Sequence, residues 1–113
     1  MMLVQAVEPV IYEDIEALIK DIPPESIVSR TILKTEYGNV TLFGFDAGQS
    51  LSEHTSTRPA IMHFLRGEAT VTLDEQVVDA RPGTWIHMAA GQKHGILART
   101  TVVMLLLLFN ATE

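Results

Sequence analysis

The sequence predicts an all-β fold, an antiparallel jelly-roll barrel with one short helix near the N-terminus. Short apolar segments alternate with tight polar turns from residue 27 to residue 109, and one earlier segment has helical spacing. The chain has 113 residues and a hydrophobic fraction of 47%, which is enough for one domain with its own core. We therefore expect a single domain over residues 1–113, with the barrel at about 27–109.

The predicted helix lies in the N-terminal arm, at about 12–22. Apolar residues recur at helical intervals between Asp14 and Ile22. Pro23 and Pro24 then end the segment, because proline cannot continue the hydrogen-bond ladder of a helix.

Eight segments with the composition of strands follow this helix. They are residues 27–35, 40–47, 60–66, 69–73, 76–79, 85–89, 94–98 and 102–109. Alternate side chains of one strand share a face, so each strand has an inward and an outward set. For the strands at 60–66 and 85–89, one set is Ala60, Met62, Phe64, Ile86 and Met88, and the opposite set is Ile61, His63, Leu65, Trp85 and His87.

Composition excludes several classes of function. The chain contains no cysteine, so disulfides, thiolate metal sites and cysteine nucleophiles are excluded. The formal charge is −6 and the eight basic residues are scattered, so we expect no nucleic-acid partner. The apolar run at 102–109 is far shorter than the roughly 20 residues that a membrane helix needs. Without a signal peptide we expect a cytoplasmic protein with no membrane partner.

One segment places a histidine at a fixed distance from a glycine. Five residues separate Gly48 from His54, and Ser56 follows two positions after the histidine. Three residues then lead to Ala60, and six more lead to Gly67. His54 and Ser56 are two residues apart, which places both on one face of an extended segment.

A second segment repeats this arrangement around another histidine. Five residues separate Gly83 from Ala89, Gly91 closes the next turn, and two residues lead to His94, with three more residues before Ala98. The spacings of both segments resemble the two motifs of the cupin superfamily, a resemblance that covers about residues 27–109. It implies a conserved-barrel, RmlC-like fold that brings the two histidines together.

The resemblance also implies a metal site with a reduced set of ligands. Metal-binding cupins typically use two histidines and a glutamate of the first motif and the histidine of the second. Here His54 and His94 remain, Ser56 replaces one histidine, and Ala60 replaces the glutamate. We predict that His54 and His94 bind a divalent transition metal (Fe, Ni, Zn or Mn). The alternative is a pocket with two histidines and no metal.

Around the two histidines we expect an apolar pocket for a small organic ligand with one polar end. The alternative for most of its residues is an ordinary core. Arg58 is either a solvated loop residue or a residue that steers an anionic substrate, and Glu68 is a weaker candidate ligand. The predicted pocket residues are Ser56, Ala60, Met62, Phe64, Phe45, Ile86 and Met88, with Met104 as a further candidate.

Three functions remain open from the sequence. The first is a metal-dependent enzyme resembling dioxygenase or isomerase cupins, the second is a metal-free binding module, and the third is a structural dimer without catalysis. We expect a homodimer, because the outward set that includes Trp85 is apolar and cupins commonly dimerise through one sheet. The sequence identifies neither a substrate nor a catalytic residue.

Overall fold

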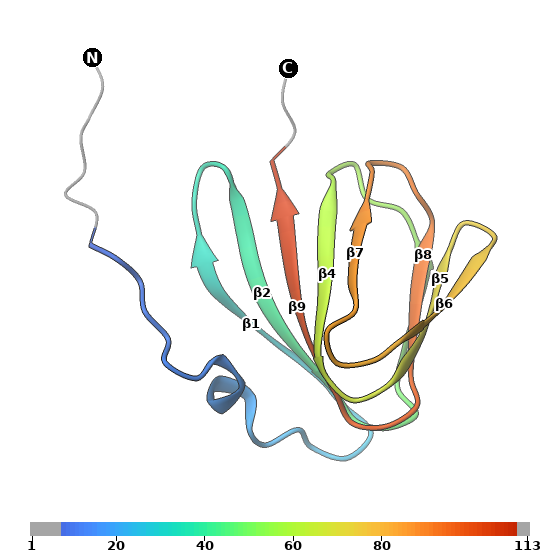
Figure 1. Ribbon diagram of the computed structural model, residues 1–113, viewed down its shortest axis with the longest axis horizontal. Helices are drawn as coiled ribbons and strands as arrows, with labels where there is room; N and C mark the ends of the chain where they lie inside the picture. Colours follow the sequence, from blue (N-terminus) through green and yellow to red (C-terminus); the bar gives the residue numbers. More distant parts are fainter. Residues whose placement is uncertain (1–7, 111–113) are drawn as a thin grey trace.

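The computed structural model describes residues 8–110, which form two antiparallel sheets (Figure 1). The first sheet has five strands in the order β1-β2-β9-β4-β7, and the second has four in the order β3-β8-β5-β6. The predicted all-β, antiparallel jelly-roll fold is confirmed. In chain order the strands are β1 (Ile27–Lys34), β2 (Gly38–Phe45), β3 (Ser50–His54), β4 (Ala60–Arg66), β5 (Ala69–Leu73), β6 (Gln76–Ala80), β7 (Trp85–Met88), β8 (His94–Ala98) and β9 (Val102–Phe109).

Strand β3 is the one strand of the described chain that was missing from the predicted segments. Its five residues contain a single apolar side chain, Leu51, so the period-2 pattern is too weak to indicate a strand. β3 forms because it pairs with β8, where Ser50 lies opposite Leu97 and Leu51 opposite Ile96.

The N-terminal helix is shorter and tighter than predicted. Only Ile15–Ile19 is helical, as the 3₁₀ helix η1, and Asp14 makes no side-chain capping hydrogen bond. A helical segment of five residues is not stable in isolation. The geometry of η1 is therefore determined by its packing against the five-stranded sheet. Ile19 and Ile22 lie over Gly44 of β2, where a Cβ atom would come within 2.7 Å of Ile22 Cδ1. The described residues contain no helix with the length and apolar character that membrane crossing requires.

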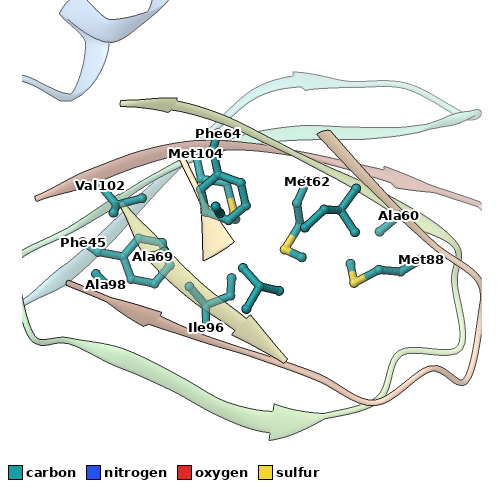
Figure 2. Packing of buried hydrophobic residues seen from close by; sticks show 13 residues of the cluster. Phe45, Ala60, Met62, Phe64, Ala69, Met88, Ile96, Ala98, Val102 and Met104 are labelled. Carbon is teal, nitrogen blue, oxygen red and sulfur yellow. The ribbon is translucent and has the colours of Figure 1, made fainter. Parts of the chain in front are cut away.

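The main core fills the space between the two sheets. Its largest members, Phe45, Phe64 and Met62, are at most 1% exposed. Figure 2 shows this cluster extending from Phe45 at one end to Met88 at the other. A smaller cluster, which includes Leu42 and Val103, packs η1 against the outer face of the five-stranded sheet.

The two ends of the barrel differ. At the closed end lie the turns at 46–49, 67–68, 81–84 and 99–101. Here Gly67 has a φ of +84°, and a Cβ atom would lie 2.0 Å from the Thr101 carbonyl oxygen, so only glycine fits. At the open end lie the loops at 35–37, 55–59, 74–75 and 89–93. The predicted site residues His54 and His94 belong to the open end.

Candidate functional site

His54 and His94 meet at the open end of the barrel. They lie directly opposite each other on β3 and β8. Their ring centroids are 4.3 Å apart and their planes are inclined by 59°. His94 is 8% exposed, whereas His54 is open to solvent. Both line a cavity of about 480 Å³, here called the open-end cavity, together with Thr55, Ser56, Thr57, Arg58, Ala60, Met88, Ala89, Leu106 and Leu108.

A bulge in β3 turns His54 into this cavity. Leu51 packs against the core and pairs with Ile96, while His54 pairs with His94. Leu51 and His54 are three residues apart on β3, whereas their partners on β8 are two residues apart. β3 therefore contains one extra residue, and beyond it the side chains point to the opposite faces from those that strict alternation gives. Glu53 is displaced to the outer face, where its Cγ lies 3.1 Å from the position of a Cβ on Gly95. Strict alternation from Leu51 would have placed Glu53 inside and His54 outside.

The backbone determines which ring nitrogen of each histidine is available. His54 Nδ1 lies 2.9 Å from the Ser52 carbonyl oxygen, and His94 Nδ1 lies 3.0 Å from the Gln92 carbonyl oxygen. A carbonyl oxygen only accepts hydrogen bonds, so each Nδ1 must carry the proton. In the neutral rings, each Nε2 then has an unprotonated lone pair that can bind a metal ion or accept a hydrogen bond.

Hydrogen bonds join the two loops that carry the histidines. The Gly91 amide donates to the Ser56 carbonyl over 2.8 Å. The Ser56 hydroxyl oxygen accepts a hydrogen bond from the Arg58 amide at 3.0 Å, which forms a turn within the 55–59 loop. Ser56 lines the open-end cavity, and its side chain also stabilises the loop.

Asp74 positions the 89–93 loop that precedes His94. Its carboxylate accepts hydrogen bonds from the Lys93 amide at 3.0 Å and from Gln92 Nε2 at 3.2 Å. Gln92 Oε1 in turn accepts the Ala89 amide at 2.8 Å. Sequence reasoning missed this role. A turn aspartate followed by a glutamine 18 residues later has no local pattern that links the two residues.

The donor set at the open-end cavity offers a metal ion two imidazole ligands, those of His54 and His94. Within residues 8–110 the structure contains no group of three or more His, Asp or Glu side chains arranged to bind a metal. Glu53 points away, and Glu68 precedes Ala69, which pairs with Ala98 at the other end of β8. Water or a bound ligand would have to complete the coordination around two imidazoles.

The predicted pocket residues fall into two groups. Ser56, Ala60 and Met88 line the open-end cavity together with the two histidines. The other four lie deeper, within the core cluster, because their inward positions fall between the packed sheets below the cavity. They are Phe45, Met62, Phe64 and Ile86, and Met104 lies with them.

Sequence reasoning left out two apolar walls of the cavity, Leu106 and Leu108. Both belong to β9 and face the same way as core residue Met104, from which they are two and four positions distant. The alternation along β9 could therefore have identified them. The outward set behaves as expected, since His63 is half-buried outside the core and His87 is exposed.

Comparisons with known proteins agree with this architecture. The family model described as a cupin domain matches residues 41–109. No curated protein is similar enough to the chain to count as a match.

Solved structures share this fold over most or all of the chain. A conserved protein of unknown function from Streptococcus pyogenes is 26% identical, with a TM-score of 0.82 over 100% of this chain and 98% of its own. A cupin superfamily protein from Desulfitobacterium hafniense is 24% identical, with a TM-score of 0.80 over 96% of this chain and 95% of its own. A predicted oxalate decarboxylase from Thermotoga maritima is 17% identical, with a TM-score of 0.70 over 75% and 81% of the two chains. The last two similarities concern the fold alone.

Proposed function

Because the chain belongs to the cupin superfamily, we propose that it is a ligand-binding cupin whose open-end cavity holds a divalent transition metal together with a small organic ligand. One observation carries the proposal. The Nδ1 atoms of His54 and His94 are both hydrogen-bonded to backbone carbonyls, which leaves both Nε2 atoms available on facing rings. A core histidine with no binding role has no need for a matched tautomer opposite a second one.

The composition of the cavity supports the second part of the proposal. Ala60, Met88, Leu106 and Leu108 contribute apolar walls, and a volume of about 480 Å³ suits a small organic molecule. A metal bound by His54 and His94 would supply a Lewis acid at the polar end of that molecule. The side chains themselves would orient the ligand, and the apolar walls would exclude water from its body.

Metal analysis of the full chain tests the proposal. Tag-free protein, purified and then reconstituted separately with Fe²⁺, Ni²⁺, Zn²⁺ and Mn²⁺, is dialysed and assayed for bound metal. We expect one ion per chain, lost in the variant His54→Ala/His94→Ala. The matched control is His63→Ala/His87→Ala, which removes two histidines outside the cavity and should retain the metal. Native protein that stays empty after every reconstitution would contradict the metal part.

The metal-free binding module is the alternative, and a thermal-shift screen distinguishes it. Small carboxylates and sugars are added to metal-free and metal-loaded protein. Stabilisation that requires the metal supports the proposal, whereas equal stabilisation without metal supports the alternative. No stabilisation by any compound would favour a structural role.

We also propose that two copies of the chain associate through the outer face of the five-stranded sheet. Trp85 is 59% exposed on this face and pairs with His63. Across β9, His63 lies opposite Leu105, and Ile61 lies opposite Leu107. These neighbouring side chains form an apolar strip that a second copy would cover.

Sedimentation velocity tests this association. We expect a dimer that Trp85→Glu converts to monomer, because the substitution places a charge within the strip. The control Val77→Glu changes a side chain that is 67% exposed on the other sheet, and it should leave the dimer intact. A wild-type monomer at every accessible concentration would overturn the proposal.

A further inference from the structure

The open-end cavity contains one permanently charged side chain, Arg58. The other lining residues are two histidines, three hydroxyl-bearing residues and five apolar residues, with no Asp or Glu among them. The whole chain nevertheless carries a formal charge of −6. The cavity is therefore a locally cationic site in an anionic protein, which favours anionic over cationic ligands.

Neutral groups hold the Arg58 guanidinium at the rim of the cavity. Its Nε donates to the Phe109 carbonyl at 3.0 Å, and its Nη2 donates to the Asn110 side-chain oxygen. Asn110 is held in turn, because its side-chain amide donates to the Glu36 carbonyl and its backbone amide donates to the Tyr37 carbonyl over 2.9 Å. The guanidinium is thus fixed in position by the end of β9 and by the turn between β1 and β2.

Among residues 8–110, no carboxylate neutralises the charge of Arg58. Within residues 8–110 the one ion pair joins Arg99 to Asp79, and Arg58 has no carboxylate partner. A guanidinium has five N–H donors, of which the described contacts use two. The remaining donors lie on Nη1 and Nη2, in a planar fork that matches the two oxygens of a carboxylate.

Building on the proposed function of this cavity, we propose that Arg58 is its specificity-determining residue and selects small monocarboxylates with a short apolar body. The carboxylate would lie on the guanidinium at the rim, and the apolar body would lie along Ala60, Met88, Leu106 and Leu108. A carboxylate fits better than a phosphate dianion, because one guanidinium balances one negative charge and the walls offer few further donors.

Isothermal titration of the full chain tests this assignment. Butyrate and benzoate are compared with butyramide and benzamide, which have the same shape but no charge, on metal-free and on zinc-loaded protein. We expect each acid to bind at least about tenfold more tightly than its amide. Arg58→Gln should weaken binding of the acids by about tenfold or more and leave the amides unchanged. Equal affinities for acids and amides, or an undiminished preference in Arg58→Gln, would overturn the proposal.

A control variant, a fallback variant and a salt titration complete the test of Arg58. Arg81→Gln is the matched control, since Arg81 is exposed in the turn at 81–84 of the closed end and should not affect binding. If Arg58→Gln does not fold, Arg58→Lys and a salt titration replace it. Binding of the acids, but not of the amides, should weaken severalfold between about 0.05 and 0.5 M NaCl because salt screens the charge. Tighter binding of inorganic phosphate than of butyrate would overturn the carboxylate assignment.

The outcomes separate this inference from the function on which it rests. If the wild type binds metal through His54 and His94 but no carboxylate, the role of Arg58 falls and the proposed metal site stands. If carboxylates bind through Arg58 to a protein that takes up no metal, the metal part falls and the inference stands. If neither binds, both are overturned.

Discussion

The closed and open ends of this barrel are built from the same strands but held by different interactions. At the closed end, the contacts are apolar and direct: Phe45, Ala69, Ala98 and Val102 are fully buried, and Gly67 lets two turns touch. At the open end, side chains bind backbone groups: Arg58 and Asp74 bind segments distant in the sequence, and Ser56 binds its own loop. The comparison indicates that apolar packing at the closed end stabilises the fold. At the open end, hydrogen bonds hold polar side chains in position while leaving them accessible at the cavity.

Shortening a core side chain should reveal this difference most strongly. Phe64 is fully buried, so Phe64→Ala should lower the free energy of unfolding by about 3–5 kcal/mol. Met88 is 3% exposed but lines the open-end cavity, where water can fill the space, so Met88→Ala should cost less than about 2 kcal/mol. Urea denaturation monitored by circular dichroism measures both. Equal losses would show that the two ends are equally packed.

A glycine substitution tests the close approach at the closed end. Gly67→Ala should cost at least about 2 kcal/mol, because a positive φ is unfavourable for alanine and the Cβ would collide with the Thr101 carbonyl. Gly83 has a similar φ of +96° but nothing within 4 Å of its Cβ position. Gly83→Ala should therefore cost only about 1 kcal/mol. Thermal unfolding of the two variants isolates the effect of the contact, and identical Tm values would refute it.

Adding a metal-binding side chain at the open end should change the metal affinity more than the stability of the fold. Ser56→His places a third imidazole at the cavity and should tighten zinc binding at least about tenfold, measured by competition with a chelator. The variant loses the hydrogen bond from the Arg58 amide, at a cost of about 1 kcal/mol. Ser50→His at the start of β3 is the control and should leave the zinc affinity unchanged. An unaltered affinity in Ser56→His would contradict the proposed position of the metal.

The smallest effect is expected from Asp74, which acts through the 89–93 loop. Asp74→Asn weakens the hydrogen bonds from Lys93 and Gln92 and should cost about 1 kcal/mol. Hydrogen exchange of the Lys93 amide should accelerate, and zinc affinity should fall by about threefold, less than for a residue that contacts a ligand directly. Glu75→Gln, on the adjacent exposed residue, is the control. Unchanged exchange at Lys93 would mean that Asp74 does not hold the loop.

The sequence predicted the closed end better than the open end, for a physical reason. Strands such as β4 and β9 carry an alternating or continuous apolar pattern, which directly reflects burial between two sheets. β3 has one apolar residue and a bulge, so neither its pairing nor the orientation of His54 follows from alternation.

Long-range hydrogen bonds account for most of the site features that the sequence did not reveal. Arg58 binds a carbonyl 51 residues away, and Asp74 binds an amide 19 residues away. Such pairs have no local signature, because the backbone group could belong to any residue. The pair His54 and His94 was predictable because the spacing of each motif places its histidine at a strand end. The η1 helix was predicted too long, since apolar spacing cannot distinguish a helix from a short segment packed on a sheet.

The bulge in β3 also gives this barrel a one-residue switch in chemistry. With the extra residue, an imidazole lies opposite His94 and the Glu53 carboxylate faces outward. Regular pairing of the same strand without the bulge would exchange the two, so that a carboxylate would lie opposite His94. The pairing of a single residue in β3 therefore determines whether this position offers a nitrogen or an oxygen donor, without substitution of either side chain.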